Sequence, residues 1–288
     1  MIDIGSGTPV VLIPGLQGRW EWMRPAVEAL AKRNRVLSFS LCDERSSPFP
    51  CEVERGFENY IDQTVAAMDR AGIDKATIAG VSYGGLIASE FAARHPDRVD
   101  ALVLASALHS AWQPNTRQRQ YLKSPWLMSP LFVATAPGRM RPEMNAAFPG
   151  MGARLRFMAS HSVRVVMAPT SPAKMARRIA WAATHRFADL RAIASRALIV
   201  TGERGLDKVV PVDITERYMA ELQSARHVVL ERTGHIGIVT RPDLFAEVMG
   251  RFLSGKPIER RGGRSVGTAG AVERESLLEN KNMVDTLR

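Results

Sequence analysis

The sequence predicts an α/β fold, in which a mostly parallel central sheet is covered by helices on both faces. Short apolar runs alternate with helical patterns over residues 9–105, and such alternation is typical of parallel sheets. With 288 residues, of which 45% are hydrophobic, the chain can bury a sizeable core. Six apolar runs are expected to form the strands: residues 9–13, 36–39, 76–79, 99–105, 197–200 and 227–230.

Helical patterns separate the first four of these strands, at residues 24–32, 56–71 and 84–94. After Ser106 the alternation stops, and roughly ninety residues pass before the next strand, which is too long for a loop in a compact domain. We therefore expect an inserted helical element. Within it, residues 155–167 repeat at helical spacing, and Ser171-Pro172 predicts the start of a second helix that continues through Trp181.

These patterns divide the chain into three parts. Residues 1–106 and 193–253 are expected to form the α/β core, and residues 107–192 a helical insertion. Residues 254–288 are small, charged and without pattern, so we expect a mobile tail there.

Composition narrows the function classes. No stretch approaches the roughly 18 apolar residues of a membrane span, and the start lacks the basic residues of a signal peptide, which favours a cytoplasmic protein. Cys42 and Cys51 have neither metal-ligand spacing nor the numbers for a disulfide framework. We find no Walker loop, dinucleotide fingerprint, metal motif or nucleic-acid recognition motif, so neither a cofactor, a metal nor a nucleic acid is expected as a partner.

The positive charge is concentrated in the insertion. The net charge is +10, and residues 107–192 alone hold 13 Lys or Arg against two acids, Glu143 and Asp189. These basic residues are expected to form a solvated face, which could also attract an anionic substrate or an anionic membrane surface. Seven of the 13 methionines fall between residues 128 and 175, and we expect them, with nearby aromatic residues, to pack the insertion on the core or to line an apolar pocket.

The most informative segment is Gly-Val-Ser-Tyr-Gly at residues 80–84, where a strand pattern passes at once into a helix pattern. Glycines at 80 and 84 remove the Cβ atoms that would collide in so tight a turn, and a strained turn would hold the Ser82 hydroxyl in the open. This strand, turn and helix resemble the nucleophile elbow of the α/β-hydrolase family. The resemblance implies a serine nucleophile at Ser82 and an inserted helical lid at residues 107–192.

The same resemblance implies a histidine base and an acid that orients it. In the chain, the acid follows the serine and the histidine comes last. His235, in Thr-Gly-His-Ile-Gly after the last strand, occupies the place of the family's histidine. For the acid, Asp207 fits when the loop is counted back from Pro211, and Glu203 is the alternative when it is counted forward from Gly202. We favour Asp207.

The oxyanion donors are implied by position. Tyr83, directly after the nucleophile, would supply one backbone N–H, and Leu16 would supply the other from Ile-Pro-Gly-Leu-Gln-Gly at residues 13–18. That loop resembles the family's His-Gly-x-x-Gly with proline in place of histidine. A further departure is the N-terminal hairpin of the family, which is expected to be short or missing because only about eight residues precede the first predicted strand.

The resemblance therefore implies a carboxylesterase-like serine hydrolase that acts on a small apolar acyl substrate, which could also be anionic. A lactonase, a C–C hydrolase and a cofactor-free peroxidase would use the same three residues. A ligand sensor with little turnover is the alternative from another functional class.

Overall fold

A computed structural model of the chain describes residues 1–114 and 116–257, with their side chains except those at 117, 129 and 131–133. Its centre is a seven-stranded sheet of order β1-β3-β2-β4-β5-β6-β7, in which only β1 runs antiparallel to its neighbour. All six predicted strands are confirmed, and a three-residue edge strand, β1, precedes them. The strands are β1 (Ile2–Ile4), β2 (Thr8–Ile13), β3 (Asn34–Ser38), β4 (Ala76–Val81), β5 (Val99–Ala105), β6 (Arg196–Thr201) and β7 (Ala225–Val229).

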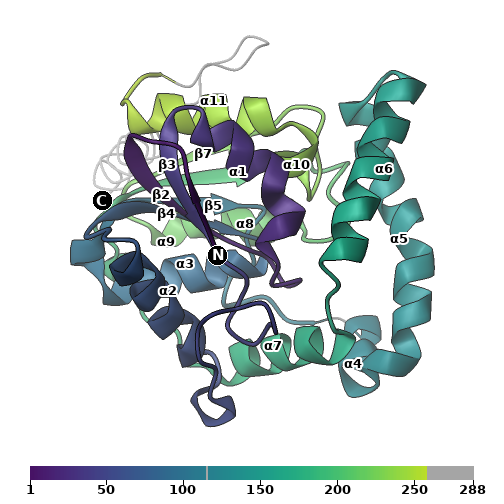
Figure 1. Cartoon of the computed structure of the whole chain (residues 1–288), viewed down its shortest axis with the longest axis horizontal. Coiled ribbons are helices and arrows are strands. Elements are labelled where there is room, and N and C mark those ends of the chain that lie inside the picture. The colour runs from purple at the N-terminus through teal and green to yellow at the C-terminus, as the bar shows by residue number, and fades with distance from the viewer. Residues whose placement is uncertain (115, 258–288) are drawn as a thin grey trace, which may run out of the picture.

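Helices cover both faces of this sheet, as Figure 1 shows. Alternate residues of each strand pack into one of two cores, so that Ile78 of β4 belongs to one core and Ala79 to the other. One core packs against α1 (Arg24–Ala31) and α11 (Pro242–Leu253), which contact each other and α10 (Gly237–Thr240). The other packs against α2 (Glu58–Arg70), α3 (Tyr83–Arg94) and the short helices α8 (Val212–Glu216) and α9 (Tyr218–Glu221). The fold class predicted from the sequence is thus confirmed.

The segment between β5 and β6 is helical. It contains α4 (Thr116–Lys123), α5 (Pro125–Ala147), α6 (Met151–Met167), α7 (Pro172–Thr184) and a 3-10 turn at Leu190–Ala192. Further 3-10 turns of the described residues lie outside this segment, at Trp20–Met23, Val53–Arg55 and Pro96–Arg98. In Figure 1, α5 and α6 stand beside the sheet, while α4 and α7 lie below it. The two predicted helices correspond to α6 and α7, and Ser171 holds the N-cap position of α7 without a side-chain cap bond.

Helix α5 has no counterpart among the predicted elements. It contains three internal prolines, Pro130, Pro137 and Pro142. Proline lacks the backbone N–H that an internal helical position uses and clashes with the preceding turn. A helix with three of them therefore gives no helical signal in the sequence.

The surface of the insertion corrects two expectations. Phe157 packs against the core, but Trp126, Met151 and Met167 are 67%, 67% and 77% exposed and do not pack the insertion onto it. Arg178, expected on a solvated face, is fully buried.

Two further observations concern the chain as a whole. None of the helices in the described residues is long and apolar enough to cross a membrane. Most of the tail predicted at residues 254–288 lies outside the described residues, which end at 257.

Candidate active site

Ser82 lies at the turn between β4 and α3. Its φ is 53°, a left-handed conformation that is rare for a residue with a side chain. Hydrogen bonds hold the turn on both sides, because Ser82 N donates to Ala105 O, and Ser82 O accepts from Gly85 N and Leu108 N, each at 2.9 Å. The strained backbone is thus fixed by the neighbouring strand and helix.

The glycines around Ser82 are required by close backbone contacts. A Cβ atom on Gly80 would lie 2.2 Å from the carbonyl oxygen of Gly84, and one on Gly84 would lie 2.5 Å from that of Ile13. Real Cβ atoms do not approach oxygen so closely, so each position admits only glycine. The collision expected from the sequence is confirmed.

Ser82, His235 and Asp207 form a continuous chain of contacts. His235 Nε2 lies 3.1 Å from Ser82 Oγ, and His235 Nδ1 lies 3.2 Å from Asp207 Oδ2. The other carboxylate oxygen of Asp207 accepts hydrogen bonds from the backbone N–H groups of Val209 and Val210, at 2.9 and 3.0 Å. These two bonds fix the carboxylate, so that its free oxygen faces the imidazole.

Glu203, the alternative acid, has a different partner. Its Oε1 accepts a hydrogen bond from the backbone N–H of Arg232 at 2.6 Å. The carboxylate therefore holds the loop that leads to His235, whereas Asp207 contacts the imidazole itself.

The loop after β2 lies against the serine. A Cβ on Gly15 would be 3.4 Å from Ser82 Cβ, and the turn is closed by a 2.8 Å bond from Gly18 N to Gly15 O. Leu16 lies in this turn, and Tyr83 begins α3, where backbone N–H groups have no partner inside the helix. The two residues expected to carry oxyanion donors thus flank Ser82 from a loop and from a helix start.

The three side chains are covered rather than open. Ser82 and His235 are each 9% exposed, and Asp207 is 7% exposed. Most of the Ser82 residue, whose hydroxyl was expected to stand in the open, is therefore covered. Burial lowers the local dielectric, which strengthens the hydrogen bonds between these three side chains.

Sequence reasoning missed a buried arginine behind the Leu16 loop. Arg178 of α7 donates from Nη1 to Leu16 O and from Nη2 to Asp43 Oδ1, both at 2.7 Å. Burial disfavours its charge, but the carboxylates of Asp43 and Glu44 raise the pKa of Arg178 above its ordinary value. The guanidinium also fills the place of a Cβ at Gly18. The adjacent acids at 43 and 44 were the one available signal, since such a pair is costly to bury without a cation.

A second missed residue is Glu143 of α5. It is 1% exposed, and its carboxylate accepts hydrogen bonds from the loop and short helix that follow His235. As one of only two acids in residues 107–192, it was visible in the sequence, but nothing there indicated its partner.

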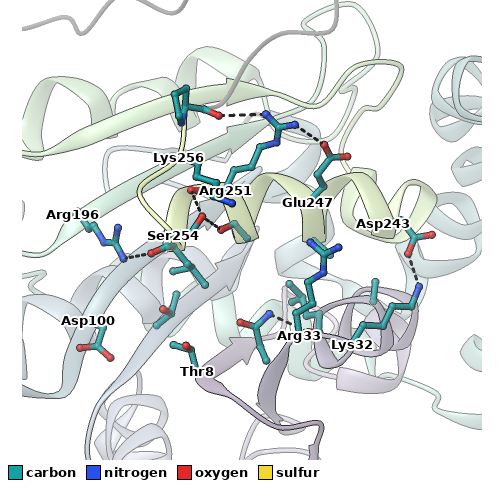
Figure 2. Close-up of a pocket in the computed structure, with 18 residues that line it drawn as sticks. Thr8, Lys32, Arg33, Asp100, Arg196, Asp243, Glu247, Arg251, Ser254 and Lys256 are labelled. Carbon is teal, nitrogen blue, oxygen red and sulfur yellow. Dashed lines mark hydrogen bonds and ion pairs between the residues drawn. The ribbon is translucent and has the colours of Figure 1, made fainter.

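Two of the cavities formed by the described residues bear on the location of the site. One cavity, of about 1160 Å³, lies at the amino ends of the strands, opposite Ser82. Figure 2 shows its lining, in which Lys32 pairs with Asp243 and Arg251 with Glu247. The other, of about 480 Å³, borders Asp207 and is lined also by Trp112, Lys208 and Ile214. Of these two cavities, only the second has a residue of the Ser82–His235–Asp207 contacts, Asp207, in its lining.

The chain is similar to known hydrolases over most of its length. Over 265 residues the chain is 27% identical to the 2-hydroxymuconate semialdehyde hydrolase of Pseudomonas sp. (strain CF600), covering 88% of this chain and 89% of that protein. It is 26% identical to the 2-hydroxy-6-oxo-2,4-heptadienoate hydrolase of Pseudomonas putida, covering 88% and 91%.

Solved structures show the same fold. The enol-lactonase from Burkholderia xenovorans LB400 matches with a TM-score of 0.66 and 24% identity, over 88% of this chain and 95% of that one. The bromoperoxidase from Bacillus anthracis matches with a TM-score of 0.69 and 19% identity, over 88% and 94%. The family model of the alpha/beta hydrolase fold matches residues 8–242. The chain therefore belongs to the alpha/beta hydrolase fold family and is a hydrolase.

Proposed function

We propose that the protein is a serine hydrolase that cleaves a carboxylic ester or a similar acyl substrate, with Ser82 as nucleophile, His235 as base and Asp207 as orienting acid. The observation that carries this proposal is the pair of consecutive contacts from Ser82 Oγ to His235 Nε2 and from His235 Nδ1 to Asp207 Oδ2, at 3.1 and 3.2 Å. A serine hydroxyl is a weak nucleophile until a positioned base takes its proton.

In the first half of the reaction, Ser82 Oγ attacks the substrate carbonyl while its proton passes to His235 Nε2. Asp207 accepts the Nδ1–H bond and stabilises the imidazolium that forms. The backbone N–H groups of Leu16 and Tyr83 would bind the oxyanion of the tetrahedral intermediate. The intermediate collapses when His235 gives its proton to the leaving alcohol, which leaves Ser82 acylated.

In the second half, a water molecule attacks the acyl-enzyme and loses its proton to His235. The second tetrahedral intermediate expels Ser82 Oγ, which takes that proton back. The products are a carboxylic acid and the free enzyme, so the three side chains return to their starting protonation states.

The substrate is proposed to be a small apolar acyl compound that can carry a negative charge. The open cavity of about 480 Å³ beside Asp207 is the observation behind this class, because its lining combines the apolar Trp112 and Ile214 with the cations of Arg204 and Lys208, although the acids Asp207 and Asp213 also line it. The half-buried Trp112 and Ile214 would contact the body of the substrate, and Lys208 would attract a carboxylate.

A second candidate reaction is hydrolysis of a C–C bond next to a carbonyl in an unsaturated oxo acid. The named relatives, hydrolases of 2-hydroxymuconate semialdehyde and of 2-hydroxy-6-oxo-2,4-heptadienoate, match over 88% of the chain and favour it. Such a substrate would also pass through an oxyanion. A panel of chromogenic esters, lactones and oxo dienoates, each assayed for kcat/KM, separates the two candidates.

The role of Ser82 is tested by a fluorophosphonate probe and a Ser82→Ala variant. We expect the probe to label Ser82, and the variant to lose roughly 10³-fold or more of kcat. Ser89→Ala is the matched control, because Ser89 is a buried serine of α3 whose hydroxyl bonds to Leu86 O and Tyr218 rather than to His235. Labelling without turnover of any substrate would favour the sensor alternative, and full activity of Ser82→Ala would refute the proposal.

A further inference from the structure

One carboxylate of the helical insertion holds the backbone on both sides of His235. Glu143 Oε2 accepts a hydrogen bond from Ile236 N at 3.2 Å, and the backbone N–H of Gly234 also donates to this carboxylate. Its Oε1 accepts from Thr240 Oγ1 at 3.1 Å, at the end of α10. The residues before and after the histidine are therefore bound by a side chain that comes from α5, more than ninety positions earlier in the chain.

The contact is tight enough to exclude a side chain at Gly234. A Cβ there would lie 2.8 Å from Glu143 Oε2 and 2.5 Å from Leu206 O, next to Asp207. Gly202, at the end of β6, approaches the same loop, since its Cβ would lie 2.5 Å from Gly234 O. The loop that carries His235 is thus enclosed between the loop that carries Asp207 on one side and Glu143 on the other.

A charge at this position is unfavourable for stability. Glu143 is 1% exposed, and burial raises its pKa above the ordinary value, although the amides of Gly234 and Ile236, the hydroxyl of Thr240 and His235 act in the opposite direction. A glutamine could accept the same amide bonds at a lower cost of burial. Packing and hydrogen bonding alone therefore do not require an ionisable group at this position.

We propose that Glu143 is a positioning residue for His235, which fixes the backbone on both sides of the imidazole and places a second negative charge beside it. The inference rests on the proposed role of His235 as the base. Asp207 contacts the ring directly, whereas Glu143 acts through the backbone and through its charge. Both carboxylates favour the imidazolium that forms when Ser82 loses its proton.

The three elements that meet at this cluster carry several charged groups. On α5 they are Arg139 and Arg141, on the β6–α8 loop Glu203, Asp207 and Lys208, and on the β7–α10 loop Glu231, Arg232 and His235 itself. A Glu143→Gln substitution leaves all of them in place and removes one negative charge.

The test is the pH profile of kcat/KM for Glu143→Gln. His235 must be neutral to act as a base, so activity rises with pH through the acid limb of the profile. Loss of the Glu143 charge favours the neutral imidazole. We expect the acid limb to move to lower pH by roughly half a unit or more, and kcat at the plateau to fall roughly threefold or more because the imidazolium that forms loses a stabilising charge.

Two controls separate positioning from structural support. Asp189→Asn removes the only other acid of residues 107–192, which is exposed and bonds to Arg191 N, and it should leave the profile unchanged. Thr240→Val removes one hydrogen bond from the Glu143 carboxylate but keeps its charge, so it should lower Tm without moving the acid limb. A merely structural role predicts the same signature for Glu143→Gln as for Thr240→Val, and that result would overturn the inference.

Glu143→Asp provides a second, opposite test. It keeps the charge, but the shorter side chain cannot reach both amides, so kcat should fall while the acid limb stays close to that of the wild type. Wild-type kcat in this variant would also overturn the inference. If Ser82→Ala abolishes turnover while Glu143→Gln and Glu143→Asp behave as wild type, the proposed function stands and only this inference fails. If Ser82→Ala remains active, both fail together.

Discussion

Arg178 Nη1 donates a 2.7 Å hydrogen bond to the carbonyl oxygen of Leu16, across 162 positions of sequence. The bond joins helix α7 of the insertion to the loop expected to carry an oxyanion donor. The same guanidinium is held by Asp43 and Glu44, and it fills the space beside Gly18. The orientation of the Leu16 peptide thus depends on a side chain that lies in a different part of the chain.

An Arg178→Lys variant should lose transition-state stabilisation more than substrate binding. Lysine keeps the charge, but it cannot bond in a fixed fork to Leu16, Asp43 and Glu44 at once. We expect kcat to fall roughly tenfold or more, with a smaller change in KM. Steady-state kinetics and the affinity for a boronate inhibitor, which mimics the tetrahedral intermediate, measure this. Arg177→Lys is the matched control, since Arg177 is 37% exposed and lies 3.4 Å from Asp43; an equal loss in both variants would contradict the prediction.

The acid is tested by Asp207→Asn and Glu203→Gln. The first variant turns the partner of His235 Nδ1 into an amide, which can leave the ring in the wrong tautomer, and kcat should fall by roughly 10³- to 10⁴-fold. The second removes the charge that binds Arg232 N but leaves the contact between Asp207 and His235 intact. It should retain activity within roughly threefold, as expected for residues that do not touch the base. The reverse order of effects would assign the acid to Glu203.

A Gly234→Ala variant should disable the site with little effect on the rest of the fold. Its Cβ would meet Leu206 O at 2.5 Å and Glu143 Oε2 at 2.8 Å, so the loop of His235 must shift. We expect kcat/KM to fall roughly a hundredfold. Gly250→Ala, in α11, is the control, because nothing lies within 4 Å of the added methyl group and its activity should be that of the wild type. Wild-type activity in Gly234→Ala would show that the loop tolerates the displacement.

The stability of the protein should fall on acidification because of His161. Burial, with a smaller effect of Arg164, lowers the pKa of His161 from 6.5 to about 4, and the ring stacks on Phe157 and meets the edge of Trp22. The folded state thus favours the neutral ring. The stabilisation is complete above pH 6.5 and is lost as the pH falls toward about 4.

A His161→Phe variant removes this dependence. Between pH 7.5 and 4.5, the wild type should lose on the order of 1–2 kcal/mol of unfolding free energy relative to the variant. Urea unfolding of both proteins at each pH gives this difference. Parallel pH dependence in the two proteins would show that His161 does not titrate on unfolding.

The sheet could be predicted because its information is local. Each of the six predicted strands contains an apolar run, whereas the three-residue β1 does not. The steric need for glycine at 80 and 84 is set by residues within one turn, apart from the approach of Ile13. The expected residues of the site could be found for the same reason, since each follows the end of a strand. The loop count left Asp207 and Glu203 open, and only the folded chain shows that Asp207 contacts His235.

The insertion could not be predicted to the same depth, because its contacts are long-range. The three prolines of α5 remove the helical pattern from its sequence, so that helix was not predicted. The burial of Arg178 depends on Asp43, which lies 135 positions away in the sequence. Glu143 is an ordinary acid in the sequence until the fold places it beside Ile236. The burial of Ser82 is likewise a property of the assembled protein, which no local pattern encodes.

The bonds from Arg178 to Leu16 and from Glu143 to Ile236 also bear on how this protein could be re-engineered. Grafting the helical segment of a relative onto this scaffold would replace Arg178, which donates to the Leu16 loop, and Glu143, which accepts from the His235 loop. A chimera that omits these two residues, or lacks the acids at 43 and 44, should keep Ser82, Asp207 and His235 in its sequence but lose their alignment with the surrounding loops. A successful exchange should therefore keep Arg178 and Glu143 in the grafted segment, and Asp43 and Glu44 in the recipient core.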